Sequence, residues 1–537
     1  MKAFLMFRER DFNFAWDSRE FRRYEVRQLR RTETVADSLP KTTADLVQDL
    51  ELNTLFAAMS AGDPFLLDVS KKAILTSLGE PEEILYRQEI LKDCFAQPDM
   101  VRSMYGIAIE AVTRERKVWG WSSTSSPRGV LHRSVEVLQI FVELLEHLRQ
   151  LSDEYRSKVH SEGFTRFFRI IAEELSNEYI RTVEEHLKRL ELRNGVLMSA
   201  QLTQGNKAGD YILRKLPQEE LTWKRRVQNW VKNQFVGDSR LVYEVDPRDE
   251  AGGRALDDLR AQGISHVAAA LAESSDHILD FFKMLCAELG FYAACLNVRD
   301  QMSSKGEPIC FPEPAPAAAP VLYARGLYDI CLSLATAERV VGSDVKADSK
   351  HLIMITGANR GGKSTFLRSV GLAQLMMQAG MFVPAQSFRA SVCSGIFTHF
   401  KREEDAAMKS GKLDEELARM NSITEKLSPN SMVLCNESFA STNEREGSEI
   451  ARQIVRTLLE CGIKVVYVTH LFDLAHSFHH AQMGNALFLC AERLADGTRT
   501  FRITEGEPLP TSYGEDLYSR IFGDHHTTTA CTRIDRL

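Results

Sequence analysis

One glycine-rich segment of eight residues constrains the fold of this chain more than any other part of its sequence. Residues 357–364 read Gly-Ala-Asn-Arg-Gly-Gly-Lys-Ser and satisfy the pattern G-x-x-x-x-G-K-[ST]. The segment follows a short apolar run at 351–356 and precedes a helix-like stretch that starts at Thr365. Two further apolar runs, at 431–435 and 464–469, are separated by helix-length segments. This order predicts an α/β domain with a mostly parallel sheet.

The same segment predicts a binding site for phosphate groups. Its glycines allow backbone N–H groups to converge on phosphate oxygens, and the positive end of the following helix favours the same anion. We expect Lys363 to reach the β- and γ-phosphates of a nucleotide and Ser364 to ligate Mg²⁺. The alternative, a fortuitous glycine turn, is disfavoured by the flanking strand and helix. The predicted nucleotide-binding residues are Gly357, Ala358, Asn359, Arg360, Gly361, Gly362, Lys363, Ser364 and Thr365.

Two other apolar runs end in residues that suit hydrolysis. The run at 431–435 is followed by Asn436 and Glu437. Glu437 is expected to position the attacking water, whereas Asn436 replaces the usual aspartate and can hold Mg²⁺ only through a water. The uncharged amide predicts weaker Mg²⁺ affinity or slower turnover. His470, at the end of the run 464–469, is expected to sense the γ-phosphate, although a histidine at a strand end can also be structural.

The composition is that of a folded chain with several domains. The 537 residues are 44% hydrophobic and 26% charged. The formal net charge is −7, so any positive charge for nucleic acid must be local. Ten cysteines lack a Cys-x-x-Cys pair, which favours reduced thiols in a cytosolic compartment. The apolar N-terminus is too short for a signal peptide, and no run reaches the ~18 apolar residues of a membrane helix.

Changes in the spacing of apolar residues and in proline content along the chain predict the domain organisation. Apolar residues at three- and four-residue spacing run from Val135 to Leu148 and from Phe164 to Leu190, with Tyr179 in the second stripe. Both stripes indicate packed helices. Four prolines within 312–320 cannot continue a helix and predict a linker. The predicted segments are an N-terminal part of unknown role (1–42), a helical region (43–190), an insert with strands (191–254), a second helical region (255–311), the linker (312–320), the α/β domain (321–523) and a tail (524–537).

A local basic cluster lies within or beside the predicted insert. It is interleaved with Trp223 and Trp230. Such side chains would pair with phosphates without reading base sequence. The alternative is a solvated amphipathic helix whose tryptophans pack inward. The candidate DNA-contact residues are Arg214, Lys215, Lys224, Arg225, Arg226 and Lys232.

The ordered motifs resemble the MutS family of DNA mismatch repair. Residues 356–365 are similar to the family's T-G-P-N-x-G-G-K-S-T loop, 382–385 to its Y-V-P-A, and 512–514 to a late S-Y-G. Residues 65–88 are more loosely similar to its helical core. The resemblance implies an ABC-type ATPase domain and a helical lever with a small clamp that touches double-stranded DNA. It also implies a homodimer in which each subunit completes the other's ATP site, partly through a signature at Ser410 and Gly411.

The chain also departs from the family pattern. The core resemblance starts near residue 45, so we expect the mismatch-reading domain to be missing. Phe7-Arg8-Glu9 spells that domain's F-x-E motif, but such a short match arises easily by chance. Residues 412–416 replace a serine-threonine-phenylalanine stretch, and 438–447 replace a segment with glycine and arginine. These changes indicate a divergent MutS-like branch.

The leading hypothesis is a dimeric DNA-binding ATPase that hydrolyses ATP slowly with Mg²⁺ and switches a clamp on DNA. The candidate catalytic residues are Lys363, Glu437 and His470, and the expected location is cytoplasmic. A second hypothesis is a nucleotide-gated scaffold that binds ATP but barely hydrolyses it. A third keeps hydrolysis but replaces mismatch sensing with recognition of branched or recombining DNA.

Overall fold

The chain folds into two compact units. The computed structural model describes residues 2–12, 14, 41–118, 126–192, 197–202, 208–214, 249–402, 411–494 and 497–508. The first unit is built mainly from 103–157 and 166–286, and the second from 3–102, 158–165 and the residues from 287 onward. The prediction of several domains is therefore confirmed. Across the described residues, no helix has an apolar stretch long enough to cross a bilayer.

The first unit is helical and carries one strand pair. Helix α7 (Pro127–Tyr155) packs on α9 (Asn177–Leu190), and its residues Leu131 and Val135 join Ile264 and Ala268 of α11 (Glu250–Ser304) in a buried cluster. Strands β1 (Leu197–Leu202) and β2 (Ala208–Arg214) pair antiparallel, and Leu213 packs against that cluster. The two short apolar segments of the predicted insert thus form a hairpin fixed to the helices.

The second predicted stripe covers two helices rather than one continuous face. Helix α8 (Glu162–Glu174) ends two residues before α9, and the side chain of Ser176 caps α9 by accepting from the backbone N–H of Tyr179. The break changes the phase of the apolar pattern. Phe164 and Phe168 are fully buried, but Tyr179 is 55% exposed. The prediction that Tyr179 belongs to the buried stripe is therefore wrong.

The second unit contains the predicted parallel sheet. Its order is β12-β11-β6-β10-β9-β8, and only β12 runs antiparallel to its neighbour. A smaller mixed sheet has the order β3-β7-β4-β5. Helix α11 ends at Ser304, and the proline-rich stretch contributes β3 to this smaller sheet, where it pairs with β7. The division of the chain into seven segments remains a prediction.

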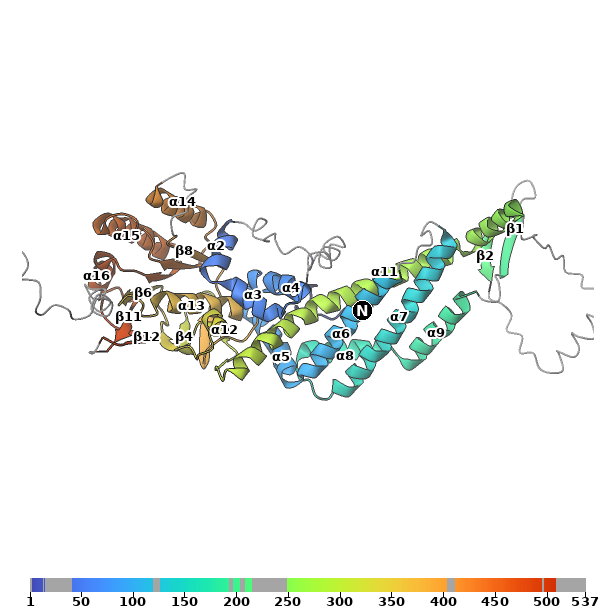
Figure 1. The fold of residues 1–537 in the computed structure, drawn as a ribbon, viewed down its shortest axis with the longest axis horizontal. Helices are drawn as coiled ribbons and strands as arrows, with labels where there is room; N and C mark the ends of the chain where they lie inside the picture. Colours follow the sequence, from blue (N-terminus) through green and yellow to red (C-terminus); the bar gives the residue numbers. More distant parts are fainter. Residues whose placement is uncertain are drawn as a thin grey trace, which may run out of the picture. The chain divides into compact units, whose positions relative to one another are not determined.

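Helices cover both faces of the six-stranded sheet, as Figure 1 shows for α13 on one side and α14 and α15 on the other. Alternate residues along each strand face opposite layers. Val433, Val465 and Tyr467 pack with apolar residues of α15 (Glu444–Glu460) and α16 (Phe472–His480). On the other face α13 (Lys363–Gln378) approaches so closely that a Cβ on Gly371 would lie 2.5 Å from Leu434. Near-continuous apolar strands are expected where both faces are buried.

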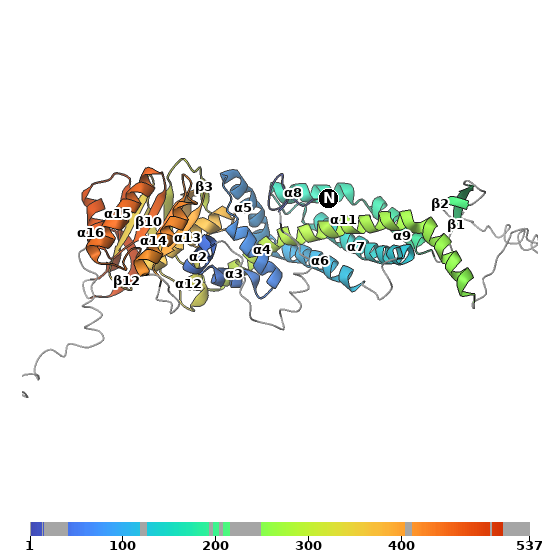
Figure 2. The same ribbon diagram turned by 90° about the horizontal axis from the view of Figure 1, so that it is seen from above.

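Helices from the start of the chain belong to the same unit as the sheet. Helix α2 contacts β8, α3 contacts α12, and α4 contacts α13, and Figure 2 shows α2 and α3 beside these elements. Arg368 on α13 pairs with Asp329 and with Glu51, which lies between α2 and α3. The helix after the glycine-rich loop is therefore tied to the N-terminal helices by charge as well as by packing.

Residues 3–7 are largely buried and are bonded to helix α5 (Pro81–Ala96). The Tyr86 hydroxyl donates to the carbonyl of Phe4 at 2.7 Å, and Arg87 Nε donates to the carbonyl of Met6 at 2.8 Å. Phe7 is 7% exposed, with the guanidinium of Arg87 4.5 Å from its ring centre. A side chain held in this way is not presented as a wedge for DNA, so the chance reading of the F-x-E match is favoured.

The remaining elements complete the description. They are α2 (Lys41–Asp49), α3 (Leu52–Ser60), α4 (Pro64–Leu75), α5 (Pro81–Ala96), α6 (Pro98–Lys117), β3 (Glu313–Ala315), β4 (Leu322–Leu327), α12 (Ile330–Ala335), β5 (Ser343–Lys346), β6 (Leu352–Gly357), β7 (Ser387–Ser391), β8 (Ile396–Phe400), α14 (Lys412–Thr424), β9 (Met432–Asn436), β10 (Lys464–Val468), β11 (Ala486–Arg493) and β12 (Arg499–Glu505).

Candidate functional site

Three neighbouring strands bring the predicted motifs to one edge of the sheet. In the register of the sheet, Val468 of β10 pairs with Ile355 of β6 on one side and with Asn436 of β9 on the other. The backbone N–H of Glu437 donates to the carbonyl of Val468 at 2.9 Å. Because the strands are parallel and end together, the glycine-rich loop, Glu437 and His470 leave the sheet at the same edge.

The loop after β6 has a backbone that requires glycine at two positions. Gly357 has a φ of 108°, and Gly362, the N-cap of α13, has a φ of 91°. A Cβ on Gly357 would lie 2.8 Å from the backbone nitrogen of Ala491, so a side chain there would be strained and also crowded. The loop therefore ends at a helix N-terminus with its amides close to the open edge of the sheet.

Lys363 is buried within this loop. Its ammonium Nζ donates to the carbonyls of Gly357 at 2.8 Å and Ala358 at 2.9 Å. Burial lowers the pKa of Lys363 to about 8, against the opposing effect of Glu437. Within the part of the chain that the structure describes, both hydrogen bonds of this cation go to neutral carbonyls. No anion among these residues is therefore bonded to its positive charge.

The residue after Lys363 connects the loop to β9. The Ser364 hydroxyl donates to Oδ1 of Asn436 at 2.9 Å. A hydroxyl and an amide oxygen in contact are oxygen ligands of the kind that Mg²⁺ uses, either directly or through water. The two residues predicted to hold the metal therefore meet, with Ser364 in the first turn of α13 and Asn436 at the end of β9.

Glu437 and His470 form a pair beside the loop. Glu437 Oε1 lies 2.9 Å from His470 Nε2, with both side chains about one-third exposed. The hydrogen bond from His470 holds the pKa of Glu437 below its usual range, and Lys401 and Lys363 act in the same direction. Glu437 also has a φ of 55°, in the left-handed region that L residues rarely adopt. The carboxylate is therefore kept ionised and aimed by several contacts.

Of the other predicted loop residues, two are exposed to solvent and one lines a cavity. Asn359 and Arg360 are exposed at the tip, where Arg360 has a φ of 58°. Thr365 in the first turn of α13 lines the cavity described below. Of the predicted signature, Gly411 is the exposed N-cap of α14, and Ser410 lies outside the described residues.

Little of the basic cluster can be placed. Arg214 is at the end of β2, where its Nε donates to the Ser199 hydroxyl at 2.8 Å. The other five candidates lie outside the described residues, namely Lys215, Lys224, Arg225, Arg226 and Lys232. DNA contact by this cluster remains a prediction.

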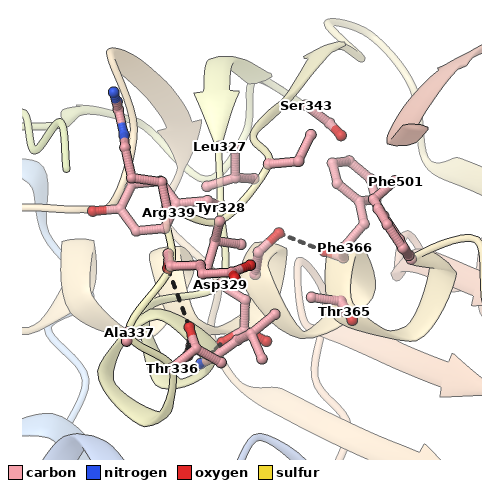
Figure 3. Close-up of a pocket in the computed structure, with 16 residues that line it drawn as sticks. Leu327, Tyr328, Asp329, Thr336, Ala337, Arg339, Ser343, Thr365, Phe366 and Phe501 are labelled. Carbon is pink, nitrogen blue, oxygen red and sulfur yellow. Dashed lines mark hydrogen bonds between the residues drawn. The ribbon is translucent and has the colours of Figure 1, made fainter. Parts of the chain in front are cut away.

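Sequence reasoning missed a cavity of 570 Å³ beside the loop. It is lined by Gly362 and Thr365 of the loop and helix, and by Phe501 of β12, as Figure 3 shows for the labelled side chains. Phe501 is 53% exposed and Val341 is 42% exposed. A cavity with both apolar and polar lining residues and an exposed aromatic ring suits a flat heterocycle. Nothing in the local pattern around Phe501 distinguishes it from an ordinary strand residue.

Fold and site together define an α/β domain of the class that places a glycine-rich loop, a carboxylate and a histidine along one sheet edge. A family model described as the MutS2 N-terminal domain matches residues 79–305, and one described as MutS domain V matches residues 353–520. The chain belongs to the MutS family. The matched ranges include helices α5 to α9 and α11 and, apart from Leu352, the strands of the six-stranded sheet.

Individual relatives match a smaller part of the chain. The DNA mismatch repair protein MutS of Thermotoga sp. (strain RQ2) is 34% identical over 182 residues, which are 34% of this chain and 23% of that protein. MutS of Petrotoga mobilis is 28% identical over 172 residues, or 32% of this chain and 21% of that protein. MutS of Clostridium botulinum (strain Alaska E43 / Type E3) is 35% identical over 130 residues, or 23% of this chain and 14% of that protein. The matches thus span less than a quarter of these relatives.

Proposed function

We propose that this protein is a MutS-type ATPase that binds DNA and that its glycine-rich loop, Glu437 and His470 form the hydrolytic site. The observation that carries the proposal is the alignment of β6, β10 and β9, which places all three motifs at one sheet edge. Ligands of open parallel sheets bind at the carboxyl ends of the strands. Family membership supports the same assignment.

The residues present fit a nucleoside triphosphate with Mg²⁺. Gly357 and Gly362 have positive φ values, which allow the tight loop backbone that an anion cradle needs. Lys363 donates to the carbonyls of Gly357 and Ala358, which are neutral, so its charge is available for phosphate oxygens. Ser364 and Asn436 would hold the metal, which would neutralise phosphate charge when bound. Asn436 contributes no negative charge, and we therefore expect slow turnover.

Glu437 and His470 would have different roles in hydrolysis. The ionised carboxylate of Glu437 accepts a hydrogen bond and can therefore orient a water or take its proton. His470 holds that carboxylate in place and lies at the end of β10, between the loop strand and the glutamate strand. A change in charge at the loop would be felt at His470, which is the basis for a sensing role.

The cavity beside the loop would take the base of the nucleotide. It shares Gly362 and Thr365 with the phosphate-binding elements, and its mouth carries the exposed ring of Phe501. Stacking on an aromatic ring tolerates any base. The phosphate loop and the cavity together therefore match the two ends of one nucleotide.

Two features support a second candidate, a scaffold that binds ATP and barely hydrolyses it. Asn436 stands where a carboxylate would complete the metal site, and residues 412–416 differ from the family signature. From the family we infer a homodimer that forms a clamp on double-stranded DNA. We infer from the same source that each subunit completes the other's ATP site. Recognition of branched or recombining DNA rather than a mismatch is a further alternative for the DNA structure that the protein prefers.

Calorimetry and turnover assays separate these alternatives. We expect wild type to bind ATP with Mg²⁺ and to hydrolyse it faster with DNA, Lys363→Ala to lose binding, and Glu437→Gln to bind without turnover. Tight binding by wild type without phosphate release would select the scaffold. Equal rates in all three proteins, or no heat of binding to wild type, would overturn the proposal. A panel of homoduplex, mismatched and junction DNA, with and without ATP, then identifies the preferred structure.

A further inference from the structure

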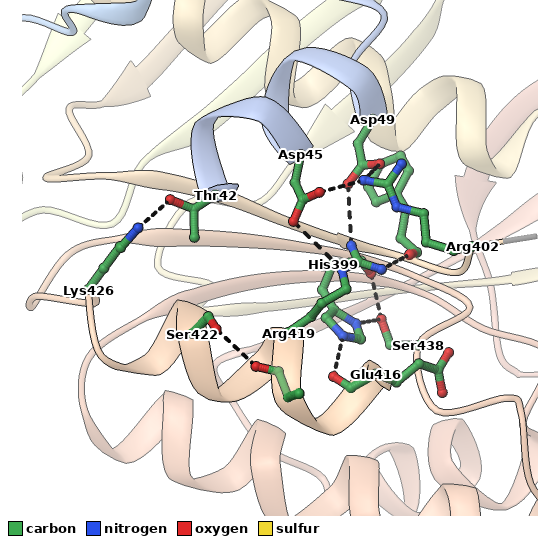
Figure 4. A network of polar contacts seen from close by, with 12 residues as sticks. Thr42, Asp45, Asp49, His399, Arg402, Glu416, Arg419, Ser422, Lys426 and Ser438 are labelled. Atoms are coloured by element: carbon green, nitrogen blue, oxygen red, sulfur yellow. Dashed lines mark hydrogen bonds and ion pairs between the residues drawn. The ribbon is translucent and has the colours of Figure 1, made fainter. Parts of the chain in front are cut away.

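A buried histidine joins the loop that carries Glu437 to helix α14. His399 on β8 is fully buried, and both of its ring nitrogens have partners. Nδ1 lies 2.7 Å from the Ser438 hydroxyl, and Nε2 lies 2.9 Å from the backbone carbonyl of Glu416. Figure 4 shows the imidazole between these two groups. Ser438 directly follows Glu437, and Glu416 lies in the first half of α14.

The hydrogen-bond partners define the tautomer of the ring. The carbonyl of Glu416 can only accept, so Nε2 of His399 carries a proton. Burial lowers the pKa of His399 to about 4, which favours the neutral ring, and Nδ1 is then an acceptor. The single hydrogen of the Ser438 hydroxyl has two acceptors at 2.7 Å, this Nδ1 and the backbone carbonyl of His399. The imidazole therefore donates to α14 through Nε2 and contacts the Ser438 hydroxyl through Nδ1.

The loop on the Ser438 side is held in an unusual conformation. Glu437 and Phe439 have φ values of 55° and 62°. The Tyr467 hydroxyl donates to the carbonyl of Ser438 at 2.7 Å, and the Phe439 ring stacks on His399 with centres 5.2 Å apart. Left-handed residues persist only where neighbouring contacts hold them. His399 supplies two of these contacts, one through its nitrogen and one through its ring.

Helix α14 is anchored on the other side of His399. Arg419 donates to the carbonyl of Phe400 at 2.9 Å and is nearly buried beside Asp45 and Asp49 of α2. Arg402, which follows β8, lies 2.8 Å from Asp45 and 3.1 Å from Asp49. Figure 4 shows these charges around the same helix. The carbonyl that His399 binds belongs to Glu416 of α14, so any shift of the helix would also move this carbonyl.

We propose that His399 is a positioning residue that couples α14 to Glu437, so that the position of α14, whose N-cap is the signature residue Gly411, sets the position of the water-orienting carboxylate in the same subunit. The inference rests on the proposed function, because it gives α14 a signature role and Glu437 a hydrolytic one. It adds a connection between them that passes through a single neutral imidazole. In a dimer, a signature that engages the partner's nucleotide would thereby alter hydrolysis in its own subunit.

Three substitutions of His399 separate coupling from simple packing. His399→Phe keeps the ring stacked on Phe439 and removes both hydrogen bonds. His399→Asn can keep the bond to Ser438 but not the one to Glu416, and His399→Gln can keep the bond to Glu416 but not the one to Ser438. His351→Phe is the matched control, since His351 precedes β6 at the opposite end of the strands. Each protein is measured for kcat, KM, affinity for a non-hydrolysable ATP analogue and melting temperature.

Coupling through both bonds predicts one pattern. All three variants of His399 lose kcat by about 10- to 100-fold, as misplacement of a reacting group does, while KM and analogue affinity stay at the wild-type value. The Asn and Gln variants melt closer to wild type than the Phe variant, yet their kcat is no higher. The control matches wild type.

Other results overturn the inference. An unchanged kcat in His399→Phe would do so, as would a kcat that falls only in proportion to the melting temperature. A wild-type kcat in His399→Asn alone would also do so, because it would show that the bond to α14 is not needed. If wild type binds ATP without turnover, amide hydrogen exchange replaces kcat. In wild type, the analogue must then change the exchange rates of 412–424 and of 437–442. In His399→Phe, it must change the rate of one of these segments without changing the other. Failure of wild type to bind ATP is seen before any variant and rejects the proposed function instead.

Discussion

The Ser364 hydroxyl donates a hydrogen bond to Asn436 Oδ1 at 2.9 Å, although the two residues are 72 positions apart. The contact joins the residue after the loop lysine to the end of a strand two places away in the sheet. It places a neutral amide where a carboxylate would strengthen a cation site. The consequences for metal affinity can be measured directly.

We expect Asn436→Asp to strengthen the dependence of turnover on Mg²⁺. Aspartate keeps an acceptor for Ser364 and adds a negative charge within a few ångströms of the metal. At an effective dielectric constant near that of a protein surface, such a charge is worth at least ~1.4 kcal/mol, or roughly a tenfold lower half-saturating Mg²⁺ concentration. ATPase rates over a Mg²⁺ series check this. Asn436→Ala, which removes the acceptor and adds no charge, is the control. An aspartate variant with the wild-type Mg²⁺ curve would contradict the prediction.

ATP affinity should fall as pH rises through about 8, the lowered pKa of Lys363. Below that pH the ammonium is charged and binds phosphate directly. Above it the free protein has lost the proton, so binding must take one up and weakens by up to ~10-fold per pH unit. Isothermal calorimetry in two buffers with different ionisation enthalpies reports the proton uptake. Lys363→Met should bind weakly at every pH. A wild-type affinity that is flat across this range would rule the assignment out.

Phe501→Ala is expected to weaken the binding of ATP by roughly tenfold, because base stacking on an aromatic ring is worth about 1–3 kcal/mol. Binding of inorganic tripolyphosphate should not change, since it contacts only the loop. Phe501→Trp, which keeps a stacking surface, should retain ATP affinity. Competition against a fluorescent ATP analogue measures all three. Equal losses for ATP and tripolyphosphate would indicate damage to the loop rather than loss of a base contact.

Glu288 should make the folded protein less stable as pH rises. Its carboxylate accepts from the backbone N–H of Leu5 at 2.6 Å, and burial raises its pKa to about 7. A raised pKa stabilises the fold fully below the ordinary value of 4.5, and this contribution is lost as pH rises through about 7. Glu288→Gln keeps the acceptor without the charge. We expect its melting temperature to equal that of wild type below pH ~5 and to exceed it by roughly 2 °C above pH ~8. Parallel curves at all pH values would show that Glu288 does not titrate there.

The sequence allowed the chemistry-bearing loop and its neighbours to be found because their signals are local. An apolar run followed by Gly357 and Lys363 is read within one strand, one turn and the start of one helix, and Glu437 and His470 each follow an apolar run in the same way. Helical stripes are similarly local, but the stripe that included Tyr179 failed where α8 ends and α9 begins. A periodic pattern continues through a break in the helix only if the phase is kept, and here it is not.

The tertiary structure decided which of these residues meet. The strand order puts β10 between β6 and β9, and only that order brings Ser364 to Asn436 and His470 to Glu437. The cavity at Phe501 and the bridge at His399 join segments that are distant in the chain, and each residue alone resembles an ordinary strand residue. Local sequence patterns reflect backbone preference and the burial of one face. Contacts between distant segments depend on how the elements pack, and for that reason the cavity at Phe501 and the contacts of His399 with Ser438 and Glu416 became visible only in the folded chain.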